Sequence, residues 1–299
     1  MADFNKTHRY SEIHWFPGHM AKTRRIIKEC LPSVDAVIEI LDARIPLSSR
    51  NPEINEICSG KPRLVILSKS SLANPSMTAA WKKYFENKGG CIAADFINGN
   101  GLSEIEPAIR ALLSEKSAKN EARGMGGKEL KAMVVGIPNV GKSSFINKFS
   151  GSKKAKVEDK PGVTREKQWV KTPYGIDLLD MPGVLWPKLS ERRAAENLAI
   201  TGAVKDSVLN TEELAVVLCK RLLKASPELF FERYKIKPEE IEDLEDYEIF
   251  ELVGRKRGFL ISGGEINYER TALTLLDEYR SGKIGRITLE LPPREVRGE

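Results

Sequence analysis

A glycine-rich segment, GIPNVGKSS at residues 136–144, is the strongest sign of chemistry in this sequence. It follows an apolar run at 131–137 and precedes a helix-like run at 143–149, which is the context of a phosphate-binding loop. Such a loop turns its backbone N–H groups toward phosphate oxygens, and the start of the following helix adds partial positive charge. The lysine would bridge the β- and γ-phosphates, and the first serine would bind Mg²⁺. The predicted phosphate-binding residues are Asn139, Val140, Gly141, Lys142, Ser143, Ser144 and, further along the chain, Gly183.

Two further segments fit a nucleotide site of this kind. The segment DLLDMPG (177–183) reads as a strand followed by Asp180 and Gly183, where a carboxylate can hold Mg²⁺ and a glycine amide can sense the γ-phosphate. The segment KPGVT supplies Thr164, whose hydroxyl and carbonyl could complete the metal site. By itself it is a turn and the start of a strand, but its spacing from the loop favours a Mg²⁺ site made of Ser143, Thr164 and Asp180.

The elements that must position these residues alternate between strand-like and helix-like patterns. Short apolar runs, typical of buried parallel strands, lie at 36–43, 63–68, 90–95 and 131–137. Helix-like patterns lie at 81–90 and 102–115, and the polar, glycine-containing stretch 114–129 reads as a surface connection. This alternation predicts an α/β fold with a doubly wound, mostly parallel sheet.

The pattern becomes helical in the last third of the chain. Asn210 and Glu213 form an N-cap pair ahead of an apolar stripe, and another helix is predicted from Ile266 to Arg280. We therefore expect two domains, an α/β domain over residues 1–200 and a smaller α-helical domain over residues 201–299.

The composition is that of a globular protein. Of the 299 residues, 41% are hydrophobic and 30% are charged, and the net charge of +6 mildly favours a polyanionic partner but also suits a solvated surface. The four cysteines form no CxxC pair, so we expect neither a zinc site nor a disulfide framework. The sequence has neither a signal-like apolar core near its start nor a run near the ~18 apolar residues of a membrane span. These features predict a soluble, cytoplasmic protein.

The order of the elements is unusual, because three candidate strands precede the phosphate-binding loop. That order resembles a circularly permuted P-loop GTPase domain, in which the base-reading loops come first and the phosphate loops last. Several independent segments together resemble the ribosome biogenesis GTPase A family over nearly the full chain: HWFPGHMAKTRR (14–25), LDARIPLSSRNP (41–52), GIPNVGKSS, PGVT, DMPGVLWP (180–187) and TGAVKDS (201–207).

This resemblance implies GTP or GDP, Mg²⁺ and K⁺ as cofactors, and a role in late assembly of the large (50S) ribosomal subunit. It further implies a partner made of ribosomal RNA and ribosomal proteins, an RNA-contacting C-terminal domain, no membrane partner, and a monomer away from the ribosome. Hydrolysis would be stimulated by the ribosome.

The resemblance also points to His19 as the catalytic residue. Many GTPases place a water-orienting glutamine where this chain has Val184, whereas a neutral imidazole can orient water. Without the resemblance, His19 reads as a structural histidine in a turn. Asn139 matches an asparagine that ligates K⁺ in potassium-dependent relatives, and it reads equally well as a turn residue.

The base-reading loops depart from the family pattern. Where relatives carry Asn-Lys-x-Asp, this chain has Ser68, Lys69, Ser70 and Ser71, and where they carry Asn-Ser or Ser-Ala it has Asp95 and Phe96. A carboxylate that accepts from guanine N1–H and the exocyclic amine is therefore missing at position 71. Loss of two charge-assisted hydrogen bonds of about 1.5–3 kcal/mol each would cost roughly two to four decades of affinity. Three outcomes follow: weak guanine preference, purine binding with little preference, or a scaffold that binds little nucleotide.

Two classes of function are consistent with the sequence. One is a Mg²⁺-dependent, K⁺-stimulated GTPase that switches on its nucleotide state, and the other is an RNA-binding ribosome assembly scaffold with weak or non-specific purine binding. The basic segments at 192–193, 255–257 and 280–286 support the second class, although each also suits an ordinary solvated face. A metabolic kinase fits less well, because the segments around Thr164 and Asp180 resemble switches more than a substrate pocket.

Overall fold

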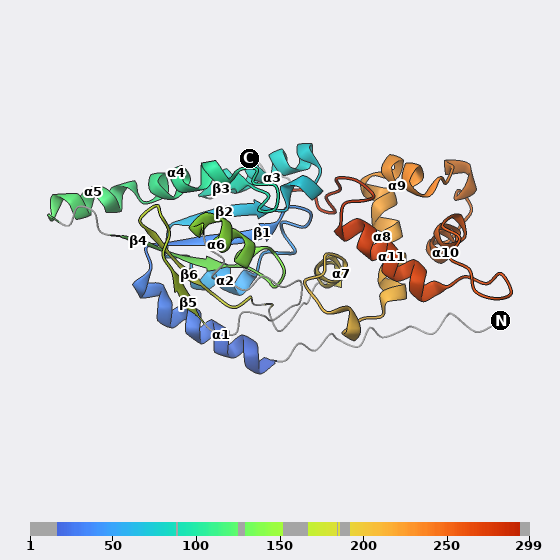
Figure 1. Ribbon diagram of the computed structural model, residues 1–299, viewed down its shortest axis with the longest axis horizontal. Helices are drawn as coiled ribbons and strands as arrows, with labels where there is room; N and C mark the ends of the chain where they lie inside the picture. The colour runs from blue at the N-terminus through green and yellow to red at the C-terminus, as the bar shows by residue number, and fades with distance from the viewer. Residues whose placement is uncertain are drawn as a thin grey trace, which may run out of the picture.

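A six-stranded sheet forms the α/β part of the protein (Figure 1). The computed structural model describes residues 17–87, 89–124, 129–151, 167–183, 185 and 192–293. The strands are β1 (Ala36–Asp42), β2 (Arg63–Ser68), β3 (Gly90–Ala93), β4 (Leu130–Val135), β5 (Gln168–Val170) and β6 (Ile176–Asp180). Their order is β3-β2-β1-β4-β6-β5, and every neighbouring pair is parallel except β5–β6. The predicted α/β fold with a mostly parallel sheet is confirmed.

Helices cover both faces of the sheet, which explains why its strands are almost continuously apolar. The residues of β4 alternate between the two layers: Met133 and Val135 pack in one cluster with Ile27, whereas Val134 packs with Phe145 in the other. The first layer includes α1 (Pro17–Cys30) and α2 (Pro52–Ile57), with α3 (Pro75–Glu86) beside them; the second includes α4 (Leu102–Leu112) and α6 (Lys142–Ser150).

The structure corrects one local prediction and adjusts others. The stretch 114–129 is not a simple surface connection, because Ser114–Ala122 forms helix α5. Its Glu, Lys and Ala residues are good helix formers, so polarity alone was a poor sign of a loop. Strands 36–43 and 63–68 were predicted almost residue for residue, whereas the strand expected at 90–95 ends at Ala93.

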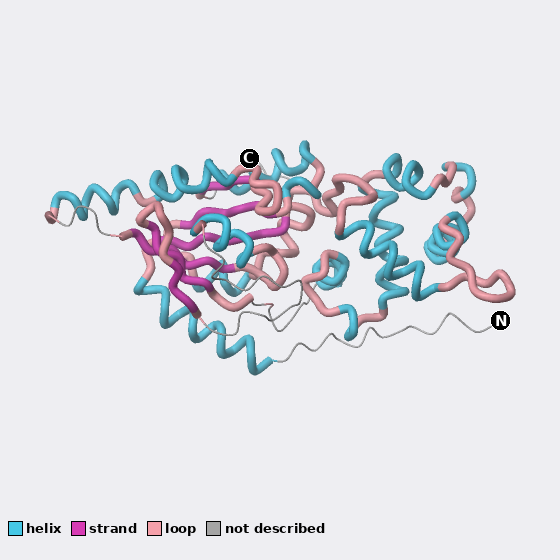
Figure 2. The backbone as a smooth tube through the Cα atoms, in the orientation of Figure 1, coloured by secondary structure: helices cyan, strands magenta, loops and turns pink. Residues whose placement is uncertain are grey.

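The last described part of the chain is helical (Figure 2). Its helices are α7 (Arg192–Ile200), α8 (Thr211–Ala225), α9 (Pro227–Tyr234), α10 (Asp246–Lys256) and α11 (Tyr268–Arg280). Helix α8 packs against the other four, and the side chain of Asn210 caps its first turn as predicted. In Figure 1, α7 lies between the sheet and the remaining helices. The domain boundary at residue 200 stays a prediction.

After α11 the chain returns to the sheet. The backbone N–H of Ile287 donates to the carbonyl of Leu72 at 3.1 Å, and that of Leu289 donates to the carbonyl of Arg44 at 2.8 Å. Glu290 then places its carboxylate against the loop after β1, where it accepts from the N–H groups of Leu47 (2.7 Å) and Ser48 (3.1 Å). The helical part is therefore attached to the sheet through its tail as well as through the connection after β6.

Replacement of Glu290 by alanine is expected to lower the free energy of unfolding by about 2–4 kcal/mol, because several buried donors would lose their acceptor. Glu290 is only 8% exposed, and it also accepts from the side chains of Ser48 and Asn197. Urea unfolding of Glu290→Ala measures the change, with the exposed Glu265→Ala as control. Equal midpoints for the two variants would contradict the role of the tail.

Candidate nucleotide site

The phosphate-binding loop lies between β4 and α6, as the sequence predicts. The loop lies at the carboxyl ends of β1 and β4, which are adjacent strands. The strand order reverses its direction between these two strands. Open α/β sheets bind ligands at such a switch point. A Cβ atom on Gly136 would lie 2.6 Å from the carbonyl oxygen of Ile40, so only glycine allows the loop to pass so close to β1. Helix α6 begins at Lys142, and its first turn contains Ser143 and Ser144.

The Lys142 ammonium is held inside this loop. Its Nζ atom donates to the carbonyls of Gly136 (3.0 Å) and Ile137 (2.7 Å), and the residue is 7% exposed. Burial lowers the pKa of Lys142 to about 8, although the nearby Asp180 carboxylate opposes the shift. A lysine in such a position is ready to exchange two backbone acceptors for phosphate oxygens.

Asp180 ends β6 beside this lysine. Burial raises its pKa to about 6, and the positive charge of Lys142 limits the rise. Its Oδ1 atom is buried and makes no hydrogen bond within the described residues. An unpartnered, buried carboxylate oxygen next to a phosphate-binding loop fits a Mg²⁺ ligand, since Mg²⁺ prefers oxygen donors.

Gly183 brings the segment after β6 against the loop. A Cβ atom there would lie 2.8 Å from Nζ of Lys142 and 3.0 Å from the backbone nitrogen of Pro138. Any side chain at this position would therefore displace the lysine or the loop. The structure thus brings Lys142, Asp180 and Gly183 together, as the sequence predicts. Thr164 and Val184 lie outside the described residues, and His19 lies in α1 with a side chain that is not described.

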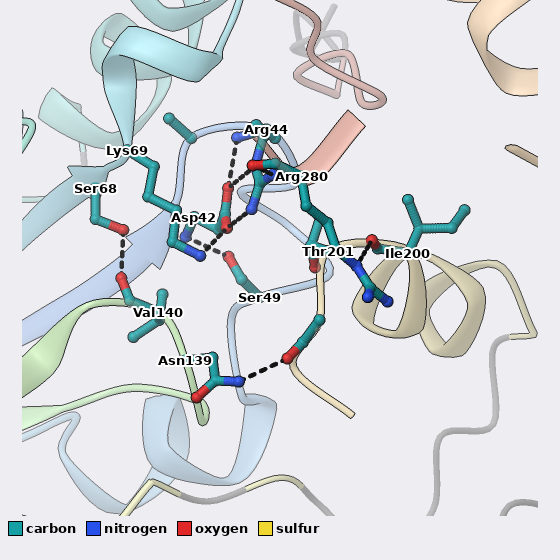
Figure 3. Close-up of polar contacts among 12 residues, drawn as sticks. Asp42, Arg44, Ser49, Ser68, Lys69, Asn139, Val140, Ile200, Thr201 and Arg280 are labelled. Atoms are coloured by element: carbon teal, nitrogen blue, oxygen red, sulfur yellow. Dashed lines mark hydrogen bonds and ion pairs between the residues drawn. The ribbon is translucent and has the colours of Figure 1, made fainter. Parts of the chain in front are cut away.

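Asn139 connects the loop to the helical part of the protein (Figure 3). Its side-chain nitrogen donates to the carbonyl of Gly202 at 2.8 Å, in the turn after α7. The residue has a φ of 56°, a left-handed conformation that asparagine tolerates better than most residues. The phosphate side of the site is therefore in direct contact with the segment 201–207.

Ser68 belongs to the first of the two loops predicted to read the base, here called the base-side loops, and it braces the phosphate-binding loop. Its Oγ atom lies 2.6 Å from the carbonyl oxygen of Val140 and 2.9 Å from that of Leu41, so one hydroxyl hydrogen serves both acceptors (Figure 3). The residue is fully buried. Ser68, which stands where the family pattern has an asparagine, makes a hydrogen bond that holds the phosphate-binding loop in place.

Lys69 is anchored by the carboxylate that ends β1. Its Nζ atom lies 3.1 Å from Oδ2 of Asp42, which also forms a buried ion pair with Arg44 at 2.7 Å (Figure 3). Burial alone would raise the pKa of Asp42, but the charges of Arg44 and Lys69 outweigh it and hold the pKa well below its ordinary value. The ionised Asp42 therefore fixes the position of Lys69.

The two residues of the second base-side loop, at 95–96, have different roles. The ring of Phe96 packs on Phe145, with centroids 5.5 Å apart, and lies 3.3 Å from where a Cβ on Gly141 would be. Phe96 is thus a core residue under the phosphate-binding loop. Asp95, by contrast, accepts a hydrogen bond from the hydroxyl of Ser71. The two positions that depart from the family pattern are in contact with each other.

Comparison with known proteins agrees with this geometry. The chain is 46% identical to the ribosome biogenesis GTPase A of Bacillus cereus over 283 residues, which covers 94% of both chains. The chain belongs to the ribosome biogenesis GTPase A family. Its relative from Thermotoga maritima is 29% identical and covers 94% of this chain and 95% of its own length. Residues 131–251 match the family described as 50S ribosome-binding GTPase.

A solved structure supports the same assignment. The GDP-bound structure of TM YlqF matches 90% of this chain and 99% of its own, with a TM-score of 0.62 and 25% identity. The resemblance seen in the sequence, the α/β fold and the class of protein, a GTPase, are thereby confirmed for this family member.

Two contacts of the site were missed by sequence reasoning. The Asn139–Gly202 hydrogen bond joins residues far apart in the chain, and no local pattern indicates it. The Ser71–Asp95 hydrogen bond did leave a signal, because an aspartate is present at 95 while the expected aspartate is absent at 71. The chain therefore has a carboxylate at position 95 and none at position 71.

Loss of the Ser68 hydroxyl is expected to weaken the binding of every nucleotide by the same factor. Ser68→Ala removes a brace of the phosphate-binding loop worth about 1 kcal/mol, so the dissociation constants of GDP, GTP and ADP should each rise about 3- to 10-fold. Equilibrium titration with fluorescent analogues in Mg²⁺ and K⁺ measures this. The exposed Ser103→Ala is the control, and a loss confined to guanine nucleotides would contradict the brace.

Proposed function

We propose that this protein is a Mg²⁺-dependent, K⁺-stimulated GTPase that assists assembly of the large (50S) ribosomal subunit and switches on its nucleotide state. The observation that carries the proposal is the convergence of Lys142, Asp180 and Gly183 at the switch point of the sheet. The names of the relatives support the ribosomal role.

On this proposal the loop amides of Val140 and Gly141 and the Lys142 ammonium bind the phosphates of GTP or GDP. Lys142 gives up its contacts with Gly136 and Ile137 to do so. Ser143, Thr164 and Asp180 are the proposed Mg²⁺ ligands, and the ion neutralises charge on the phosphate oxygens when it is bound. The Oδ1 atom of Asp180, which has no hydrogen-bond partner among the described residues, is the observation that fits this role.

Two residues are proposed to assist hydrolysis. His19 would orient the attacking water, because the position after Gly183 is a valine, which can neither donate nor accept a hydrogen bond through its side chain. Asn139 would ligate K⁺ through its side-chain oxygen. The amide nitrogen of Asn139 donates to Gly202, so the oxygen, in the same plane, points in a different direction from Gly202.

The proposed partner is a precursor of the large subunit, with its ribosomal RNA and proteins. The helical domain proposed over 201–299 would contact RNA through basic segments such as 255–257 and 280–286. A cytoplasmic location and a monomeric state away from the ribosome belong to the same proposal. No helix in the part of the chain that the structure describes is long and apolar enough to span a bilayer.

The alternative is an RNA-binding assembly scaffold with weak or non-specific purine binding. The absence of a carboxylate at position 71 favours it. The two functions differ in whether the lysine of the phosphate-binding loop matters for the ribosomal role, and this difference can be measured.

Lys142→Ala is expected to abolish GTP turnover and to leave binding to ribosomal RNA or subunit precursors within about 2-fold. The ammonium contacts phosphates on our proposal, and the side chain is buried, so little of it is available to RNA. Turnover is measured in K⁺ and Na⁺ buffers, and RNA binding is measured over a salt series, whose slope counts phosphate contacts. The exposed Lys148→Ala, on the same helix, is the matched control. Subunit assembly that proceeds normally with Lys142→Ala would favour the scaffold.

His19→Ala is expected to slow ribosome-stimulated GTP turnover by about 100-fold or more while GDP affinity stays unchanged, since the residue would act on water and not on the nucleotide. Single-turnover hydrolysis and GDP titration separate these effects. His8→Ala serves as the control. A rate equal to that of the unmodified protein would remove His19 from the mechanism.

A further inference from the structure

The carboxylate of Asp95 lies beside the position where the guanine-reading carboxylate is missing. The hydroxyl of Ser71 donates to its Oδ2 atom, and the backbone N–H groups of Ile97 (2.9 Å) and Asn98 (3.0 Å) donate to its Oδ1 atom. Burial raises the pKa of Asp95, but the hydrogen bonds from Ser71, Asn98 and Ile97 outweigh it and lower the pKa below its ordinary value. A negative charge is therefore held at this point of the site.

Resting on the GTPase function proposed above, we infer that Ser71 and Asp95 together form the acceptor pair that reads guanine. Asp95 supplies the negative charge, and Ser71 supplies the second oxygen. Relative to the Ser-Ala form of the family pattern, which has an aspartate at position 71 and a serine at position 95, the two side chains have exchanged places.

The hydrogen-bonding capacity of the two side chains supports this assignment. The carboxylate of Asp95 accepts on Oδ1 from the N–H groups of Ile97 and Asn98 and on Oδ2 from the hydroxyl of Ser71, and the backbone of Ser71 adds a further hydrogen bond, so Oδ2 is the oxygen on the side of Ser71. The hydroxyl of Ser71 gives its only hydrogen to Asp95, so its oxygen presents lone pairs. Two oxygens joined by such a bond lie about 2.7 Å apart, which gives two adjacent acceptors.

Guanine carries two adjacent donors, N1–H and the exocyclic amine, that match these acceptors. Adenine carries a lone pair on N1 and a C–H group at the same edge, so it would face two acceptors with no hydrogen to share. A site built to accept hydrogen bonds discriminates strongly against a base that lacks the donors, because its own buried groups then stay unpaired.

The position and rigidity of the two loops also suit base reading. The carbonyl of Ala94 accepts from the N–H of Ser70 at 3.2 Å, so the pairing of β2 with β3 continues into the loops. The guanidinium of Arg286 donates to the carbonyls of Ser70 (3.1 Å) and Ala73 (3.0 Å) and holds the first loop from the other side. Ile97 is 85% exposed beside this pair, an apolar surface that the face of a base could cover.

Asp95→Asn tests the assignment, because it keeps an oxygen for the N–H groups of Ile97 and Asn98 and replaces only Oδ2 by an amide nitrogen. That nitrogen would oppose the donors of guanine but would donate to the C2 carbonyl of xanthine. We expect the GDP dissociation constant to rise about 10- to 100-fold and that of xanthosine diphosphate to fall about 10-fold. The exposed Asp243→Asn is the matched control.

Equal changes for GDP and xanthosine diphosphate would overturn the inference, because Asp95 would then act only on loop structure. Equal binding of GDP and ADP by the unmodified protein would also overturn it, while nucleotide binding itself would stand. If the unmodified protein bound none of these nucleotides, the proposed GTPase function would fail together with the inference.

The reciprocal exchange is an independent test. Ser71→Asp alone would place two carboxylates side by side, and their repulsion should weaken GDP binding about 10-fold or more. The double variant Ser71→Asp with Asp95→Ser restores one carboxylate and one hydroxyl, and it should return GDP affinity to within about 3-fold of the original. Tighter GDP binding by Ser71→Asp alone would overturn the inference, because position 71 would then be the only one that reads the base.

Discussion

A buried ion pair between Asp42 and Arg44 holds the parts of this protein together. Both side chains are almost fully buried at the end of β1, and Arg44 donates to both carboxylate oxygens. From this pair, Asp42 reaches Lys69 in the base-side loop, while Arg44 reaches the carbonyl of Arg280 at the end of α11 and lies over the ring of Tyr279. Removing one member of such a pair leaves an uncompensated charge at a cost of about 3–5 kcal/mol. The base-side loop and the helical part therefore depend on the same two residues.

The base side and the phosphate side of the site are mechanically joined. Val140 belongs to the phosphate-binding loop, yet its carbonyl is held by Ser68 at the end of β2. Gly141, next along the chain, lies on the ring of Phe96 from the second base-side loop. Any change that orders one of these loops therefore also orders the backbone of Val140 and Gly141. This arrangement accounts for the hydroxyl at position 68, because an alanine or a glycine there could not form the hydrogen bond with the carbonyl of Val140.

Contacts between neighbours in the chain were predictable from the sequence, and contacts across the fold were not. The strand, loop and helix that carry Lys142 occupy one continuous segment whose pattern is local, so they could be predicted nearly to the residue. The positions of Asp180 and Gly183 could be predicted from the strand that ends at Asp180 and from the spacing between the two residues. The hydrogen bonds of Ser71, Asn139 and Glu290 depend on which loops the folded sheet brings together, and periodicity carries no information about that. Helix α5 was missed because a polar composition suits an exposed helix as well as a loop.

The return of the tail after α11 has a consequence for how the helical part can move. A body joined to a base by one flexible linker can turn about any axis, whereas a body joined at two separated places can turn only about the line between them. Here one attachment is the contact of Gly202 with Asn139 and another is the run of contacts from Arg286 to Glu290, with the hydrogen bond from Arg44 to the carbonyl of Arg280 as a third. The first lies at the phosphate end of the site and the second at the base end. A displacement at Asn139 would therefore move one end of the helical part while the other attachments hold it, so the helices would tilt about the tail rather than swing freely.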